Sequence, residues 1–102
     1  MRAQKLDDAT ITARLAALPG WSLRDGKLRC AYRFADFSAA FAFMTRSALR
    51  AEQLDHHPEW FNVYNRVEIA LITHDAHGIT ALDFTLAEAM DGFARALGST
   101  AA

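Results

Sequence analysis

Two of the four histidines in this chain stand side by side, and a third follows at a distance. His56 and His57 lie in the run DHHPEW (residues 55–60), and His74 lies in THD (residues 73–75). Histidine is the one side chain that binds or releases a proton near neutral pH without environmental help. A helical pattern ends just before this run and a strand pattern follows it, and such junctions often present reactive side chains. We therefore predict that the fold brings these three imidazoles together, whereas His77 is expected to be solvated in a turn.

Carboxylates and aromatic side chains flank the histidines. Glu52 lies four residues before His56 in the last turn of a predicted helix. It could orient an imidazole through a hydrogen bond, or it could be a solvated helix residue. Trp60 and Tyr64 share a parity along the next strand and could either form the floor under a planar ring or pack against a partner subunit. Asp83 is expected to be structural, as the cap of a later helix.

A metal site is the first alternative for the histidines. Together with Glu52, Asp55 or Asp75 they could supply zinc ligands. Adjacent histidines form a poor chelate, however, and the chain has neither His-x-x-x-His on a helix nor a pair of cysteines. Cys30 falls on the inward side of a predicted strand, which argues against a nucleophile, and no glycine-rich phosphate loop is present. By themselves the residues predict a histidine-lined site without a metal, and no more specific function.

The composition is typical of a small single domain. The chain has 102 residues, 52% of them hydrophobic, and a net charge of −1 with acidic and basic residues interspersed. This balance gives no electrostatic footprint for nucleic acid, and no apolar run approaches the ~20 residues of a membrane span. The first eight residues lack the apolar region of a secretory signal, and a single cysteine excludes an intramolecular disulfide. We expect one domain over residues 1–102, with residues 1–8 loosely held, in the cytoplasm.

The first third of the chain predicts a short helix and a hairpin. Apolar residues recur at helical spacing over residues 11–18, and Pro19-Gly20 ends that helix. Asp25-Gly26 between two alternating runs indicates a tight hairpin, because both turn positions favour positive φ. The apolar side of its second strand consists of Leu28, Cys30, Tyr32 and Phe34.

A second helix and a long strand are expected next. Asp36 is the predicted N-cap of a helix that runs to about Leu54. Its predicted buried stripe consists of Phe37, Ala40, Phe41, Met44, Ala48 and Leu49. From Phe61 to about His74 the period is two, which predicts one long strand with a bulge near residues 65–66. The side of this strand that is expected to be buried carries Phe61, Val63, Val67, Ile69 and Leu71.

The last third predicts a turn, a short returning strand and a third helix. The turn is expected at residues 75–78 and the strand at Ile79-Thr80. Thr80 and Asp83 fit a capping box, and Gly98 closes the helix. Its inward residues are Leu86, Met90, Phe93 and Leu97.

These elements follow the order α-β-β-α-β-β-α. The order predicts an α+β fold in which three helices pack on one face of a four-stranded antiparallel sheet. The other sheet face and an edge strand remain uncovered, which predicts a homo-oligomer.

The run from Leu54 to Asn65, with Val67, Ile69, Leu71 and residues 73–75, resembles the pterin-4a-carbinolamine dehydratase family. Members of that family are also called dimerisation cofactors of a homeodomain transcription factor. The family pattern has a charged residue, then His-His-Pro, a later aromatic residue, a histidine and an aspartate. These places are filled without departure by Glu52, His56, His57, Pro58, Tyr64, His74 and Asp83. The motif covers residues 52–87, about a third of the chain, and the remainder agrees in element order.

The resemblance implies the fold just described and a reaction, the loss of water from 4a-hydroxytetrahydropterin to give quinonoid dihydropterin. It implies general acid and base catalysis by His56, His57 and His74, without a metal or a cofactor. Our hypothesis is that His56 and His74 exchange protons with the leaving hydroxyl and N5, and that His57 holds the pterin ring. Glu52 or Asp55 would fix a tautomer. The other residues expected to bind or orient the substrate are Pro58, Trp60, Tyr64, Thr73 and Asp75.

The resemblance also implies partners. These are the pterin substrate, further copies of the chain in a homodimer or homotetramer, and an aromatic amino acid hydroxylase that supplies the pterin in tetrahydropterin recycling. Two alternatives remain open. One is an interaction module or transcriptional coactivator that binds a helical segment through the second helix or the exposed sheet; the other is a pterin-binding regulator without turnover. The complete set of three histidines favours the enzyme, because a scaffold has no need of it.

Overall fold

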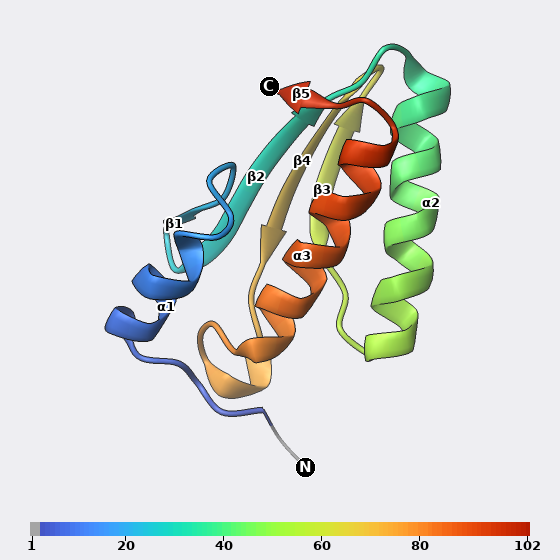
Figure 1. Ribbon diagram of the computed structural model, residues 1–102. Helices are drawn as coiled ribbons and strands as arrows, with labels where there is room; N and C mark the ends of the chain where they lie inside the picture. Colours follow the sequence, from blue (N-terminus) through green and yellow to red (C-terminus); the bar gives the residue numbers. More distant parts are fainter. Residues whose placement is uncertain (1–2) are drawn as a thin grey trace.

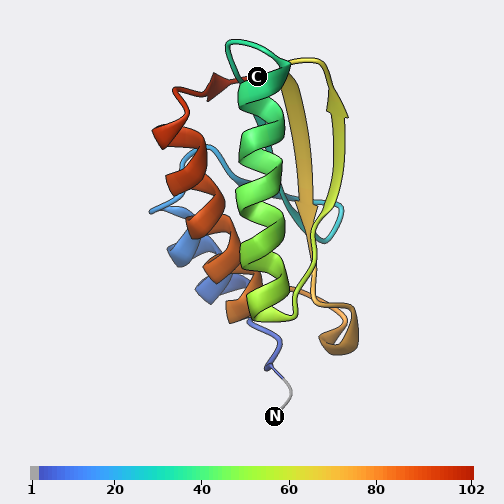
Figure 2. The same cartoon turned by 90° about the vertical axis from the view of Figure 1, so that its right-hand side faces the viewer.

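The computed structural model describes residues 3–102, which form three α-helices, one short 3-10 helix and a five-stranded antiparallel sheet. The α-helices are α1 (Asp8–Leu15), α2 (Phe37–Leu54) and α3 (Ala81–Ala96). The strands are β1 (Ser22–Arg24), β2 (Lys27–Arg33), β3 (Glu59–Val63), β4 (Arg66–Leu71) and β5 (Thr100–Ala101). The sheet order is β1-β2-β4-β3, and β5 pairs with the end of β2 that is far from β1. The helices cover one face of the sheet, with α2 and α3 side by side (Figures 1 and 2), so the predicted α+β class is confirmed with one short strand added.

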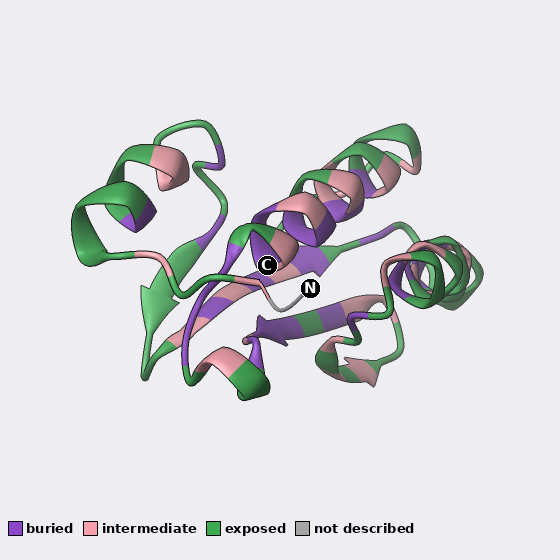
Figure 3. Ribbon diagram, turned by 90° about the horizontal axis from the view of Figure 1, so that it is seen from below, coloured by how far each residue is buried: buried purple, intermediate pink, exposed green. Residues whose placement is uncertain are grey.

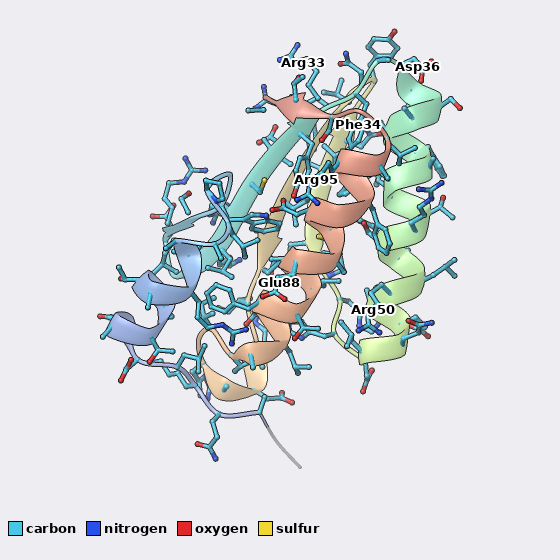
Figure 4. The ribbon with its side chains drawn as sticks, viewed as in Figure 1. Arg33, Phe34, Asp36, Arg50, Glu88 and Arg95 are labelled. Atoms are coloured by element: carbon cyan, nitrogen blue, oxygen red, sulfur yellow. The ribbon has the colours of Figure 1, made fainter. Side chains whose placement is uncertain are left out.

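The N-caps of α2 and α3 and the turn of the first hairpin lie where the sequence predicts them. Asp36 caps α2, its carboxylate accepting from the Ala39 backbone N–H at 2.8 Å (Figure 4). Thr80 and Asp83 form a complete capping box at the start of α3. Asp25 and Gly26 both have positive φ, 54° and 76°, as the tight hairpin between β1 and β2 requires.

The core lies between the helices and the sheet. The four residues predicted to form the apolar side of the second strand are all buried, and they belong to one core cluster with Phe84, Leu86 and Met90 of α3. Phe93 and Leu97 are half-buried at the edge of the same cluster. Figure 3 shows buried residues along the central strands and on the helix sides that face the sheet. Each fully buried large apolar side chain contributes about 1.5–3 kcal/mol, so this layer holds the sheet against α3.

The prediction of one long strand from Phe61 to His74 was wrong. The chain turns back at Tyr64, which has φ 47°, so β3 and β4 form a hairpin. Asn62 stabilises the turn, its side-chain amide donating to the Arg66 carbonyl at 2.8 Å. The reversal also changes which residues of β3 point toward the core. Phe61 pairs with exposed Glu68, while Trp60 pairs with buried Ile69. Phe61 and Val63 are therefore exposed rather than buried.

The predicted buried stripe of α2 was also largely wrong. Phe37, Phe41 and Leu49 are 48%, 50% and 64% exposed. Ala48 is exposed and Met44 is half-buried. The side that packs inward carries Ala40, Phe43, Ser47 and Ala51. The helix is apolar on two sides, and the side with small residues is buried because it allows close approach to the neighbouring layer.

The returning strand also differs from the prediction, and the predicted loose N-terminus is only partly described. Ile79-Thr80 is not a strand; instead Thr73 and Gly78 form an isolated bridge around the 3-10 helix η1 (His74–Ala76). Residues 1–2 lie outside the described residues, so loose ordering of residues 1–8 stays a prediction, although the Leu6 N–H donates to the Ile79 carbonyl at 2.8 Å. Among residues 3–102, no helix has both the length and the apolarity needed to cross a bilayer.

Candidate active site

The end of α2 sets the directions of His56 and His57. Asp55 ends the helix in the left-handed conformation, with φ 50°, and its backbone N–H donates to the last helical turn. The chain then runs through Pro58 into β3. Asp55 was predicted to orient an imidazole, but within residues 3–102 its exposed carboxylate has no hydrogen-bond partner, and its visible contribution is to the backbone turn.

His56 is held by a fully buried carboxylate. The residue is 8% exposed, and its Nε2 lies 2.6 Å from Oδ1 of Asp83. The other oxygen of Asp83 accepts from the Thr73 hydroxyl at 2.8 Å and from the Thr80 backbone N–H at 2.9 Å. Asp83 therefore caps α3, as predicted, and also orients His56. Because the carboxylate accepts, Nε2 carries the proton and Nδ1 is the nitrogen that remains available.

His57 and Glu52 form a second pair of imidazole and carboxylate. Their Nε2 and Oε1 atoms are 2.7 Å apart, and both side chains are exposed. Glu52 was predicted either to orient an imidazole or to be a solvated helix residue, and the imidazole that it contacts is that of His57. The left-handed turn at Asp55 explains this, because it rotates the chain after the last helical residue.

His74 forms the third such pair, with a carboxylate for which no role was predicted. His74 begins η1, is mostly exposed, and its Nε2 lies 3.3 Å from Oε2 of Glu59. The other carboxylate oxygen of Glu59 accepts from the Lys27 ammonium at 2.6 Å. That hydrogen bond from Lys27 lowers the pKa of Glu59, and the hydrogen bond from His74 adds a smaller effect in the same direction. Lys27 is 32 residues from Glu59, so no local pattern could have identified the ion pair of Lys27 and Glu59.

One cleft of about 550 Å³ collects the three histidines. The structure thus brings His56 and His57 together with His74, as predicted. The cleft is lined by Ala3, Leu54, Asp55, His56, His57, Ile72, Thr73, His74, Asp75 and Leu82. The lining combines apolar side chains such as Leu54 and Ile72 with the polar and titratable groups, as is usual for small-molecule sites.

Three of the residues expected to contact a substrate do not line this cleft. Tyr64 lies in the β3–β4 turn, at the opposite end of β3 from the histidines (Figure 1). Trp60 is half-buried and packs against the core, and Pro58 is half-buried in the link to β3. A role of these residues in substrate binding stays a prediction. Thr73 and Asp75 do line the cleft.

A second cavity, of about 490 Å³, lies on the outer side of the sheet. It is lined by residues of β1 to β4, including Arg29, Phe61 and Glu68, and it contains no histidine. Among residues 3–102, no three His, Cys, Asp or Glu side chains gather as metal ligands. The paired imidazoles make the first cleft the candidate active site.

Comparison with known proteins identifies close relatives of the chain. Residues 4–93 match the family model described as pterin 4 alpha carbinolamine dehydratase. A protein of Rhizobium leguminosarum bv. trifolii is 54% identical over 93 residues, covering 89% of this chain and 92% of the relative. One from Novosphingobium aromaticivorans is 56% identical over 95 residues, covering 91% and 99%. Both carry the provisional name pterin-4-alpha-carbinolamine dehydratase.

A solved structure gives the same picture at the level of the fold. The crystal structure of a transcriptional coactivator/pterin dehydratase from Brucella melitensis matches with a TM-score of 0.86 at 46% identity. The match covers 89% of this chain and 99% of that one.

Proposed function

The chain belongs to the pterin 4 alpha carbinolamine dehydratase family, and we propose on this premise that it removes water from 4a-hydroxytetrahydropterins to give quinonoid dihydropterins. The observation that carries the proposal is the cleft that three imidazoles share. Its volume of about 550 Å³ falls within the roughly 300–1,000 Å³ that is usual for small-molecule sites, and it is ample for a bicyclic ring.

The reaction needs one acid and one base. The bond from C4a to the hydroxyl oxygen breaks, and the hydroxyl leaves as water once it receives a proton. N5 gives up its proton, and the electron pair of that N–H bond forms the C4a=N5 double bond. No electrons are exchanged with another molecule, so positioned proton donors and acceptors suffice, and such groups typically accelerate a reaction by ~10²–10⁴-fold.

The pairing of His56 with Asp83 suggests how the roles are divided. With the proton of neutral His56 fixed on Nε2, its Nδ1 is a base that can take the proton from N5. His74 is exposed, so it can exchange protons with water and supply one to the leaving hydroxyl. His57, directed by Glu52 at the cleft edge, would hold the pterin ring. Family membership further supports a place in tetrahydropterin recycling, downstream of an aromatic amino acid hydroxylase.

The experiment is an ultraviolet assay of dehydration with chemically made 4a-carbinolamine. Wild type is expected to accelerate the reaction, and His74→Ala is expected to lower kcat by ~10²-fold, the lower end of the range for a general acid or base. His77→Asn is the matched control. His77 is exposed, has φ 57°, which asparagine tolerates, and does not line the cleft.

Two results would contradict the proposal. Equal kcat values for wild type and His74→Ala would remove His74 from the chemistry. Binding of pterin by wild type with no acceleration at all would indicate a regulator without turnover.

We also infer that the chain forms a homodimer or homotetramer. Exposed apolar side chains on α2 (Phe37, Phe41 and Leu49) and on β3 (Phe61 and Val63) support this. Large exposed apolar surfaces usually mark association sites, because leaving them in water costs about 25 cal/mol per Å². Light scattering is expected to give at least twice the 11.3 kDa chain mass, and a monomer at micromolar concentration would contradict the inference.

A further inference from the structure

Glu59 joins three parts of the chain at the end of the sheet that lies next to the cleft. It is the first residue of β3, Lys27 is the first residue of β2, and His74 begins η1. One carboxylate oxygen accepts from Lys27 at 2.6 Å and the other faces the His74 Nε2 at 3.3 Å. Glu59 itself lies on the lining of the outer cavity, whereas His74 lies on the lining of the histidine cleft. The contact between Glu59 and His74 therefore links the side of the sheet that carries the outer cavity with the side that carries the histidine cleft.

The sheet order explains why Lys27 can reach Glu59. β4 lies between β2 and β3, and Glu59 pairs with Ala70 while Leu28 pairs with Leu71. The ion pair of Lys27 and Glu59 thus spans β4 near its last residues. Beyond Leu71 the chain leads directly to Thr73 and His74, so the pair braces the strand end from which the histidine departs.

The charges favour a fixed imidazole. Lys27 lowers the pKa of Glu59, so the carboxylate is ionised at neutral pH and faces the His74 Nε2 at 3.3 Å with a negative charge. The same arrangement recurs at His56 with Asp83 and at His57 with Glu52, each through Nε2. In all three pairs Nδ1 is the nitrogen without a carboxylate partner. His74 is the most exposed of the three, so it has the greatest rotamer freedom to lose.

We propose that Glu59, anchored by Lys27, is a positioning residue that holds the His74 ring toward the cleft. This inference rests on the proposed function, because it gives His74 a part in the reaction. Neither Glu59 nor Lys27 touches the substrate in this account. Their effect on the reaction passes through the orientation of His74 alone.

The expected kinetic effect is modest and specific. Exposed ion pairs contribute little, so Glu59→Gln and Lys27→Met are each expected to lower kcat by about two- to five-fold. KM is expected to stay unchanged, because positioning a proton donor affects the chemical step rather than ground-state binding. Glu68→Gln is the matched control: Glu68 is an exposed carboxylate on β4 that faces Arg66 at 3.4 Å and contacts no histidine.

Double-mutant cycles separate positioning from a general structural effect. In the His74→Ala background, Glu59→Gln is expected to have no further effect, at enzyme concentrations where the catalysed rate exceeds the unaided one. In the Glu59→Gln background, Lys27→Met is expected to have no further effect either. Both cycles use kcat at saturating substrate.

Each other outcome overturns the inference in a recognisable way. If His74→Ala lowers kcat but Glu59→Gln acts equally with and without His74, the residue is structural and the inference alone fails. If Glu59→Gln leaves kcat at the wild-type value, the inference also fails alone. If His74→Ala itself has no effect, the proposed role of His74 fails first, and the inference fails with it.

Discussion

Two aspartates of α3 make the same kind of contact in two regions of the molecule. Asp83 lies in the first turn and Asp91 about two turns later, and each carboxylate accepts hydrogen bonds from side chains of other elements. Asp83 is fully buried and holds His56, which lines the cleft. Asp91 is half-buried and accepts from the Trp21 indole N–H at 3.0 Å and from the Tyr32 hydroxyl, neither of which lines the cleft.

A carboxylate in a functional site and a carboxylate in a structural contact can be told apart by their partners. Asp83 is more deeply buried than Asp91, but both carboxylates accept side-chain hydrogen bonds and tie α3 to distant parts of the chain. The difference that matters for function lies in the partner. When Asp83 binds His56, the second ring nitrogen of His56 stays free for a ligand. Asp91 instead binds the single polar side-chain atom of Trp21 and of Tyr32, so neither has another polar atom to offer. We therefore expect loss of Asp83 to affect both catalysis and stability, and loss of Asp91 to affect stability alone.

The largest expected effect follows from Asp83→Ala. The substitution leaves three buried donors, from His56, Thr73 and Thr80, without their acceptor. Breaking such a network typically costs about 3–5 kcal/mol, so thermal and urea unfolding are expected to show a large loss of stability. Asp83→Asn keeps the shape and one acceptor oxygen, and is expected to fold while lowering kcat by ~10²-fold, because His56 loses its fixed tautomer. An Asp83→Asn enzyme with the wild-type kcat would remove the distinction between the two aspartates.

Asp91→Ala is expected to have an intermediate effect. It leaves the Trp21 N–H and the Tyr32 O–H unpaired in a mostly apolar setting, which costs about 1–3 kcal/mol in unfolding free energy. The kcat of the folded variant is expected to equal that of wild type at a temperature well below its Tm. A fall in kcat as large as that for Asp83→Asn would show that the two regions are coupled.

The smallest effect concerns Cys30, beside Tyr32, and appears only at high pH. Burial raises the pKa of the Cys30 thiol from 9.0 to about 11, and burial together with the hydrogen bond to Asp91 raises the pKa of Tyr32 as well. The unfolded chain releases these protons at lower pH than the folded chain does, so the unfolding free energy is expected to fall as pH rises from 9 to about 11. Urea unfolding at pH 8, 9, 10 and 11 checks this, and Cys30→Ala is expected to lose less stability over the same range. A stability that stays constant to pH 11 would contradict it.

Local signals in the sequence were sufficient for much of the fold. Asp25-Gly26, Asp36 and the Thr80–Asp83 box predicted a hairpin and two helix starts, because each depends on backbone geometry within four residues. The reversal at Tyr64 was missed because alternation continues across it, so a turn resembled a bulge. Asn65, a residue type that favours turns, was the available signal, and it was interpreted as part of the bulge.

Tertiary packing decided what the local pattern could not. α2 is apolar on two sides, and periodicity alone does not say which side the sheet covers; Phe43 is buried and Phe41 is exposed for this reason. At the site, three histidines could be predicted from their types and spacing. Their carboxylates could not all be assigned, because Asp83 contacts His56 and Glu59 contacts His74 from separate segments of the chain.

The catalytic role of the buried imidazole is tested by kcat for His56→Gln in the dehydration assay at saturating 4a-carbinolamine. Glutamine can still donate a hydrogen bond to Asp83 but offers no basic nitrogen, so the fold is expected to persist, as checked by thermal unfolding. We expect kcat to fall by roughly 10²–10⁴-fold, against an unchanged kcat for Asp91→Ala. A folded His56→Gln enzyme that turns over as fast as wild type would contradict the central claim.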